Sequence, residues 1–172
     1  MSHSTAYLSL GSNVSPEKNI QFALDELVEI FGETVSSSIY KTKAVGFKGS
    51  DFLNLVVKIE TSLDPERLID RLHGIEEMTG RITGTKAFND RTLVIDVLTY
   101  DAPINLDLNI PRVEILKYVS VLEPLAELYP AGFHPIETVA IFELWIWLIE
   151  NLPPSAMLLS IIMSCLLPHV RT

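Results

Sequence analysis

The chain has 172 residues, of which 48% are hydrophobic and 20% are charged. This length and composition predict one globular domain with a proper core and exclude a disordered chain. The formal net charge is −9, which argues against nonspecific nucleic-acid binding because that needs a basic surface. A local cluster of Arg and Lys can still hold an anionic substrate against this average field.

The cysteine and histidine residues are too few and too scattered for a metal cluster. The single cysteine, Cys165, excludes an intrachain disulfide and a cysteine-based metal site. His73, His134 and His169 lie far apart in the sequence, without the spacing of zinc ligands. The first residues lack a basic start followed by an apolar core, so we expect no signal peptide and a cytoplasmic location.

The first part of the chain predicts a strand, a helix and two further strands. Residues 6–10 form an apolar run that ends at a Gly-Ser-Asn turn. A Ser-Pro-Glu helix start follows at residues 15–17, and apolar residues at helical spacing continue up to Gly32. We expect strands at residues 34–45, which are rich in Ser, Thr, Val and Ile, and at residues 52–61, where apolar residues alternate.

A second helix and another strand complete this pattern. An Asp-Pro-Glu start at residues 64–66 opens the helix and Gly80 ends it; a polar loop covers residues 81–89. Alternating apolar residues then predict a strand at residues 90–101. The order strand, helix, strand, strand, helix, strand is the βαββαβ arrangement called ferredoxin-like, so we predict an α+β fold with helices packed on an antiparallel sheet.

The last part of the chain differs in composition. We divide the chain into residues 1–135 and an apolar C-terminal segment, residues 136–172, which we expect to be helical and packed on the same domain. Its apolar runs are shorter than the roughly 18 to 20 residues that span a bilayer. Attachment to a membrane or to a partner through this segment is the alternative, because so much apolar surface must be covered.

The strand at residues 90–101 carries the most informative side chain. Thr92, Val94 and Asp96 share one face of this strand, because side chains two apart point the same way. Asp96 is therefore a carboxylate within an apolar strand, which is costly unless it is paired or binds a cation. With Arg91 beside it, this pattern suggests metal and phosphate handling; the alternative is a structural ion pair of Asp96 with Arg91 or Lys86.

Three further patterns are open to two interpretations. Phe52 and Asn54 share a strand face, where a ring to stack and an amide to hydrogen-bond suit a flat heterocycle; the alternative is a core Phe beside an edge Asn. Glu76 lies next to the apolar stripe of its helix and points inward, or lies on a solvated flank. The Gly-Ser-Asn at residues 11–13 is not a P-loop, and we interpret it as a tight turn.

Together the motifs resemble a known family. They are, in order, YLSLGSN, SSIYKT followed by VG, DFLN, TSLDPERLID, IEEMTGR, RTLVIDVLTYD, IPR and LEPLAELYP. Their order and spacing over residues 6–135 are similar to those of the 6-hydroxymethyl-7,8-dihydropterin pyrophosphokinases of folate synthesis. The resemblance implies the ferredoxin-like fold and the transfer of pyrophosphate from ATP, with Mg²⁺, to the hydroxymethyl group of a reduced pterin. ATP and that pterin are then the partners of a monomer, with a homodimer as the alternative.

The resemblance also implies roles for single residues. The pterin pocket would be lined by Thr42, Val45, Phe52, Asn54 and Phe88. The ATP side would include His73, Glu76, Arg81, Lys86, Arg91 and Arg112. Catalysis would rest on Arg81, Arg91 and Asp96, and Asp96 corresponds to one of two aspartates that hold a pair of magnesium ions.

The chain departs from the family pattern at several of these positions. Val94 stands where the family motif R-T-L-D-x-D has its first aspartate, and Arg112 stands where the family has the histidine of a Pro-His pair. Further arginines expected after Arg81 are absent, and so is a later Arg-x-Phe. Two hypotheses follow: a pyrophosphokinase that is weak because a metal ligand is lost, or an inactive relative that binds a pterin, a nucleotide or a partner protein.

Overall fold

The computed structural model describes residues 3–44, 48–80, 90–101, 104–151 and 161–163. The strands are β1 (Ser4–Ser12), β2 (Val35–Ser36), β3 (Ile39–Thr42), β4 (Phe52–Thr61), β5 (Val94–Tyr100) and β6 (Ile161–Met163). The helices are α1 (Pro16–Phe31), α2 (Pro65–Met78), α3 (Val119–Leu128) and α4 (Ile141–Asn151), with two short 3-10 helices, η1 (Leu106–Leu108) and η2 (Val113–Leu116).

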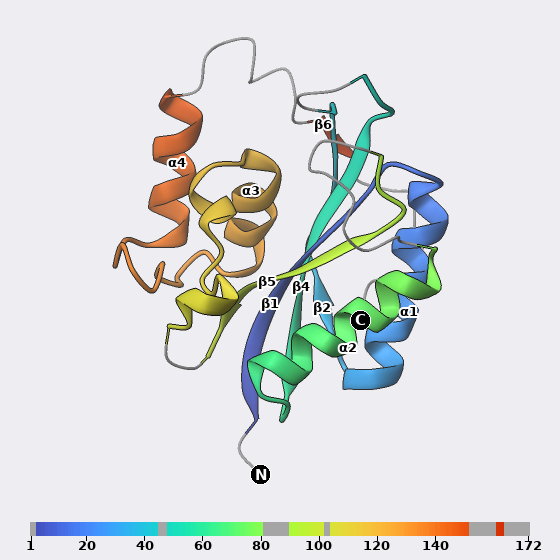
Figure 1. Cartoon of the computed structure of the whole chain (residues 1–172). Coiled ribbons are helices and arrows are strands. Elements are labelled where there is room, and N and C mark those ends of the chain that lie inside the picture. The colour runs from blue at the N-terminus through green and yellow to red at the C-terminus, as the bar shows by residue number, and fades with distance from the viewer. Residues whose placement is uncertain (1–2, 45–47, 81–89, 102–103, 152–160, 164–172) are drawn as a thin grey trace.

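One antiparallel sheet organises the molecule. Its strand order is β5-β1-β4-β3-β6, and β2 pairs with β4 beside β3. The long strand β1 lies at the centre between β4 and β5, so that Leu8 is opposite Val57 on one side and Val97 on the other. Helices α1 and α2 cover one face of this sheet and α3 and α4 the other (Figure 1). The predicted βαββαβ order and α+β fold class are confirmed.

The main core lies between the sheet and the helices α1 and α2. Alternate residues of β1, β4 and β5 point to this face, including Leu8, Leu55 and Ile95, each of which is at most 3% exposed. Helix α1 contributes Ile20, Ala23, Leu24 and Leu27, and α2 contributes Leu68, Leu72 and Ile75. Their three- and four-residue spacing places them on one stripe of each helix, which explains why these segments fold as helices on the sheet.

A second, smaller core covers the other face of the sheet. Tyr7, Val56 and Leu98 point there and pack against α3 and α4. On the same face, Asn54 and Asp96 lie near the beginnings of β4 and β5, and both are only half-buried. The α3 face is therefore closed in the middle of the sheet and accessible at one end, which is where the predicted site residues lie.

Two strands differ in extent from the sequence prediction, for local reasons. The strand expected at residues 34–45 is broken into β2 and β3, because the Ser37 hydroxyl accepts a hydrogen bond from the Val56 amide at 3.0 Å. A side chain thus takes the place of a backbone partner at the break. Strand β5 begins at Val94 rather than at residue 90, because the Arg91 carbonyl accepts hydrogen bonds from the amides of Asn13 and Val14 in the turn after β1.

The C-terminal segment is helical only in part. Helix α4 follows the apolar run after residue 139 as expected, but the described part of the later apolar run is strand β6, which pairs with β3. An open strand edge offers unpaired backbone groups, and Ile-Ile at residues 161–162 suits a strand better than a helix. Among the described residues, no helix combines the length and apolarity needed to cross a bilayer.

Candidate functional site

Asp96 and Asn54 lie on the same accessible part of the α3 face. Across the central strands, Asp96 is opposite Ser9 and Ser9 is opposite Val56, while Gly11 lies between Val94 and Asn54 in the next row of this face. Directly opposed side chains in an antiparallel pair are about 5 Å apart at Cβ, so both rows fall within the span of one small ligand. The predicted metal ligand and the predicted pterin contact are therefore neighbours.

Asp96 forms an ion pair with Arg112. Its Oδ1 lies 3.2 Å from Nη2 of Arg112, and Arg112 Nε lies 3.4 Å from Oε2 of Glu114. The backbone amide of Arg112 also donates to the Leu98 carbonyl at 2.8 Å, which attaches the residue to β5. The side chains of Arg112 and Asp96 are 26% and 32% exposed, so this pair is partly shielded from water and still reachable by a ligand.

Thr42, Phe52 and Asn54 come together on β3 and β4. Asn54 Nδ2 donates to Thr42 Oγ1 at 2.8 Å, and Thr42 is opposite Phe52 in the strand register. Gly11 gives the Asn54 amide room above β1, because a Cβ built on Gly11 would lie 3.1 Å from Asn54 Oδ1. The half-buried Phe52 ring and the oriented amide are the two groups that a flat heterocycle needs: one to stack and one to hydrogen-bond.

Helix α3 is fixed to this part of the sheet by Glu127. Its carboxylate accepts hydrogen bonds from the Ser38 amide at 3.0 Å and from the Tyr40 hydroxyl at 2.8 Å. Burial, followed by the contact with Glu127, raises the pKa of the Tyr40 hydroxyl well above its usual value, so this tyrosine stays a donor. Because Tyr40 is opposite Asn54 in the register, the network holds β3 and Asn54 in place under α3.

Asn13 is a buried residue that connects three segments of the chain, whereas the sequence predicts only a tight turn at this position. It is 4% exposed. Its Nδ2 donates to Asp90 Oδ1 at 2.6 Å and to the Ser50 carbonyl at 3.3 Å, and its Oδ1 accepts from the Arg91 amide at 2.6 Å. One side chain thus ties together the turn after β1, the loop before β4 and the segment before β5. No local pattern reveals this role, because all its partners are distant in the sequence.

Two predicted ATP contacts lie on α2, outside the α3 face. Glu76 is 1% exposed, and its Oε1 accepts the Ile95 amide at 2.6 Å. Since β5 is an edge strand, this contact satisfies an amide that has no further strand beside it. His73 is exposed on the same helix. Roles in ATP binding for Glu76 and His73 remain predictions.

The remaining predicted residues divide into two groups. Arg91 is half-buried and is positioned through its backbone by Asn13, next to the start of β5. The other four predicted residues lie outside the described part of the chain: Val45, Arg81, Lys86 and Phe88.

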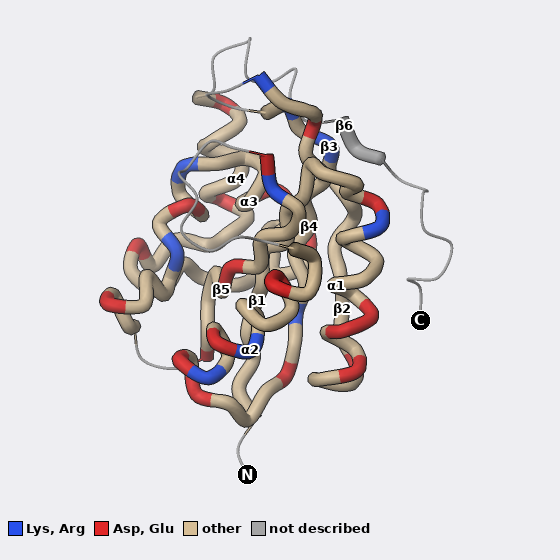
Figure 2. Tube along the Cα trace, turned by 45° about the vertical axis from the view of Figure 1, so that its right-hand side comes forward, with Lys and Arg blue, Asp and Glu red and all other residues tan. Residues whose placement is uncertain are grey.

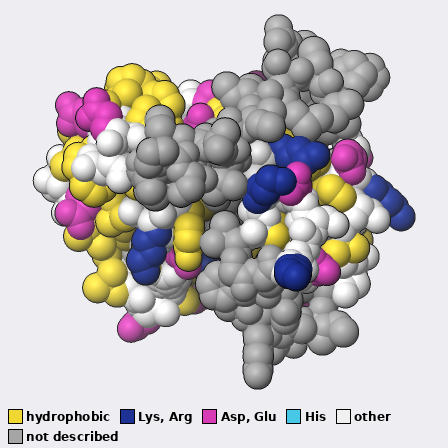
Figure 3. Space-filling model, turned by 90° about the horizontal axis from the view of Figure 1, so that it is seen from above, with side chains coloured by type: hydrophobic (Ala, Val, Ile, Leu, Met, Phe, Trp, Pro, Cys, Tyr) yellow, Lys and Arg dark blue, Asp and Glu magenta, His cyan; other side chains and the backbone are white. Residues whose placement is uncertain are grey.

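Basic side chains are exposed near the start of β4, at the end of the sheet that carries Asn54, although the whole chain is acidic. Lys41 and Lys43 share Asp51, with Nζ to carboxylate distances of 3.6 and 3.8 Å. A hollow of about 600 Å³ lies between Lys43, Lys48, Asp51 and other residues of these loops. Figure 3 looks down on this end and shows several exposed Lys and Arg side chains. Figure 2 instead shows several acidic residues along α1, so the charge distribution favours an anion at the end with the exposed basic side chains.

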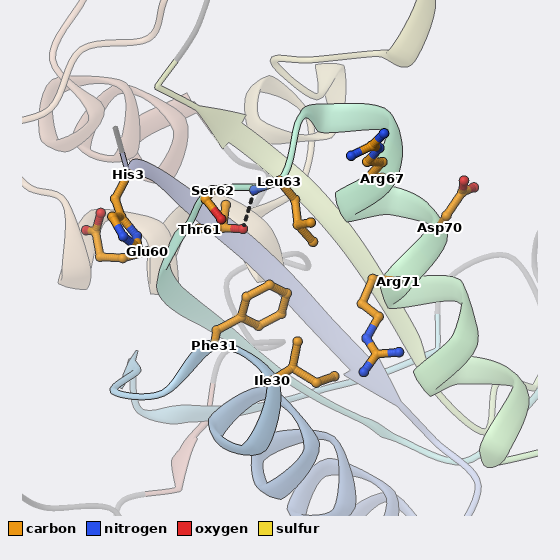
Figure 4. A pocket seen from close by; sticks show the side chains of 10 residues that line it. All are labelled: His3, Ile30, Phe31, Glu60, Thr61, Ser62, Leu63, Arg67, Asp70 and Arg71. Carbon is orange, nitrogen blue, oxygen red and sulfur yellow. Dashed lines mark hydrogen bonds between the residues drawn. The ribbon is translucent and has the colours of Figure 1, made fainter. Parts of the chain in front are cut away.

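A second hollow, of about 590 Å³, lies at the opposite end of the strands. Figure 4 shows Phe31 and Leu63 with Arg67 and Arg71 around it. Here β1 and β4 pair as Ser4 to Thr61, far along the strands from Gly11 and Asn54. Of the predicted site residues that the structure describes, none lines this second hollow, so it is separate from the described part of the candidate site.

Comparison with known proteins identifies the family. Residues 7–130 match the family model of 7,8-dihydro-6-hydroxymethylpterin-pyrophosphokinase (HPPK). The chain belongs to the HPPK family. The similar curated proteins include the 2-amino-4-hydroxy-6-hydroxymethyldihydropteridine pyrophosphokinases of Haemophilus influenzae and Aquifex aeolicus. Each is 36% identical, over 72% and 77% of this chain and 81% and 84% of the respective relative. The family match ends at residue 130 and therefore includes none of the apolar C-terminal segment, residues 136–172.

Solved structures support the fold. The HPPK-DHPS protein of Plasmodium falciparum aligns with a TM-score of 0.67 and 15% identity, over 87% of this chain. This chain spans 46% of the length of that protein. At this identity the likeness concerns the fold alone, and it agrees with the antiparallel sheet and its covering helices.

The described residues do not fit a pair of magnesium ions held by protein carboxylates. All 22 Asp and Glu residues of the chain fall within the described ranges. Among the described residues, no group of three or more His, Cys, Asp or Glu is placed to hold a metal ion. Val94 presents an isopropyl group beside Asp96, and Asp96 is already paired with Arg112. On this face of β5, the described residues thus offer a cation one carboxylate, Asp96.

Proposed function

We propose that this HPPK-family chain transfers pyrophosphate from ATP to the hydroxymethyl group of 6-hydroxymethyl-7,8-dihydropterin. The observation that carries the proposal is the family match over residues 7–130, which includes β3, β4, β5 and the part of β1 that lies in the candidate site. The neighbouring positions of Asn54 with Thr42 and of Asp96 with Arg112 support it, because a pterin and a triphosphate must lie side by side for this reaction.

The chemistry requires alignment and neutralisation of charge. The hydroxymethyl oxygen of the pterin attacks the β-phosphorus of ATP, and a new O–P bond forms. The bond between the β-phosphorus and the oxygen that bridges to the α-phosphorus breaks, AMP leaves, and the hydroxyl proton is released to solvent. Holding both reactants in line can supply a large part of the rate enhancement without a general base.

Each described residue has a role that its contacts allow. Asn54, oriented by Thr42, hydrogen-bonds the edge of the pterin ring, and Phe52 packs against the ring face. Arg112 and Arg91 approach the phosphate oxygens, for which the planar guanidinium group offers paired donors. Mg²⁺ bound to ATP would supply positive charge that offsets the charge of the phosphate oxygens. Asp96 holds Arg112 in position on the α3 face.

The test measures AMP. Protein is mixed with ATP, Mg²⁺ and the reduced pterin, and AMP is quantified by chromatography against a reaction without pterin. Asn54→Leu removes the amide at nearly constant volume, and we expect a rise in the KM for pterin. Asp107→Asn, a change at an exposed acid on η1, serves as the matched control and should leave both kinetic constants unchanged.

The outcomes separate the two functional hypotheses. AMP formation that depends on pterin supports the transferase. If calorimetry detects pterin binding and no AMP appears above the blank, the chain is instead an inactive binding relative. Absence of both pterin binding and AMP formation would remove the pterin from the proposal altogether.

A further inference from the structure

The guanidinium group of Arg112 is a positive charge that the structure places against Asp96. It lies between two carboxylates, at 3.2 Å from Asp96 and 3.4 Å from Glu114. The contact with Glu114 is an ion pair without hydrogen-bond geometry, since Arg112 Nε is buried and makes no hydrogen bond to the described residues. The backbone of Arg112 is bonded to Leu98, so the charge is fixed rather than carried on a loose surface chain.

The strand position next to Asp96 supplies no second carboxylate for a divalent ion, because it is Val94. Two-metal phosphate sites place their ions about 3.5 to 4 Å apart, which requires several oxygen ligands around them. On the accessible α3 face, Asp96 follows Val94 by two residues, so the position beside the carboxylate is apolar. The residues outside the described ranges add no Asp or Glu, because all 22 acids are described.

We infer that Arg112 replaces one of two metal ions, so that this chain engages ATP with a single divalent ion and a protein-borne cation. The inference rests on the proposed function, because it concerns the same phosphate site. A guanidinium group has five N–H donors, and Asp96 and Glu114 face only two of its nitrogens. The remaining donors are available to phosphate oxygens, which guanidinium binds through two parallel hydrogen bonds.

Arg112 is therefore a phosphate-contacting residue whose charge does not depend on dissolved metal. A metal ion leaves the site when a chelator is added, whereas the guanidinium group stays. Nucleotide binding by this chain should retain a metal-independent component. Removing Arg112 should weaken that component and should allow a second ion to bind only if a carboxylate is supplied at position 94.

The first experiment counts metal ions. The full chain is saturated with α,β-methylene-ATP, which cannot be cleaved at the reacting bond, and bound Mn²⁺ is measured by electron paramagnetic resonance of the free ion. We expect one Mn²⁺ per bound nucleotide in the wild type and two in Val94→Asp/Arg112→Gln. The matched control Val94→Asn/Arg112→Gln has the same shape without the added charge and should bind one.

The results discriminate sharply, because this experiment needs no turnover. Two Mn²⁺ in the wild type, or one in the Val94→Asp/Arg112→Gln variant, would overturn the inference and leave the proposed function standing. One Mn²⁺ in the wild type together with no AMP in the activity assay would refute the proposed transferase function and support the inference of a single bound ion. Failure of the wild type to bind the nucleotide would refute both.

The second experiment measures nucleotide affinity in EDTA by calorimetry. Loss of a charge-assisted contact predicts that Arg112→Gln binds α,β-methylene-ATP about tenfold to hundredfold more weakly than the wild type. Lys117→Gln removes an exposed positive charge close by in the sequence and should change the affinity by less than about twofold. Equal losses of nucleotide affinity in both variants would show that Arg112 acts only through the overall electrostatic potential and not through a direct contact, and the inference would fail.

Discussion

Replacing Asn13 with alanine should destabilise the protein more than its turn position suggests. The side chain makes three hydrogen bonds: two of 2.6 Å, to Asp90 and from the Arg91 amide, and one of 3.3 Å to the Ser50 carbonyl. Each contributes a net of about 1 kcal/mol to folding, so their loss predicts a cost of about 3 kcal/mol. For a chain of this length, that corresponds to a fall in Tm of about 6 to 12 °C.

The assay is urea denaturation followed by circular dichroism, with Asn105→Ala as the matched control. Among the described residues, the Asn105 side chain accepts one hydrogen bond, from the Leu108 amide at 3.2 Å, so its replacement should cost about 1 kcal/mol or less. A double-mutant cycle of Asn13→Ala with Asp90→Ala should give a coupling energy of about 1 kcal/mol, because the two side chains are directly bonded.

Activity gives an independent measurement of the same connector. Because Asn13 positions the Arg91 backbone, its loss should shift the phosphate side of the site and lower kcat/KM about tenfold or more. A cost in stability below about 1 kcal/mol, or strictly additive effects with Asp90→Ala, would refute the view that Asn13 holds the loops together.

Further predictions concern stability and substrate affinity. Burial lowers the pKa of His134, so the folded state binds fewer protons than the unfolded one; the unfolding free energy should decline as pH falls below about 6.5, and His134→Gln should flatten this dependence in urea titrations. Gly132→Ala would place a Cβ 2.0 to 2.2 Å from ring atoms of Tyr129 and should cost about 1 to 3 kcal/mol by calorimetry. Gly74 lies in α2, and a Cβ built on it would meet no atom of the described residues within 4 Å apart from its adjacent residues and the helix backbone, so Gly74→Ala should instead raise the free energy of unfolding by up to about 1 kcal/mol. Asn54→Leu should raise the KM for pterin about tenfold or more, since it leaves a ring edge without its partner, and an unchanged KM would contradict the assigned pocket.

The order of the elements follows from the sequence because its signals are local. Pro16 and Gly32 mark the ends of α1, and Asp64 accepts a hydrogen bond from the Arg67 amide as a helix cap should. Period-two alternation identified β4 residue for residue, from Phe52 to Thr61. Such features depend only on neighbouring residues, so one sequence suffices to read them.

The features that were not foreseen depend on partners distant in the chain. Ser37 interrupts the strand at residues 34–45 through a contact with Val56, and β6 forms because β3 offers an open edge. As the alternative to a metal site, the sequence suggested an ion pair of Asp96 with Arg91 or Lys86. The structure places Arg112 against Asp96, and Lys86 lies outside the described residues. That pairing requires the chain to return to β5 after η1, which no local pattern encodes.

The pairing changes what the departures from the family pattern mean. By the resemblance to the family pattern, Val94 stands at the position of a metal ligand and Arg112 at the position of a histidine, which taken singly suggests two separate defects in the proposed phosphate site. In the fold both positions belong to the surroundings of one carboxylate, Asp96. Removing a negative charge at one position and adding a positive charge at the other both reduce the demand for metal ions there. The two changes therefore act in the same electrostatic direction, as expected of a site that has exchanged an ion for an arginine.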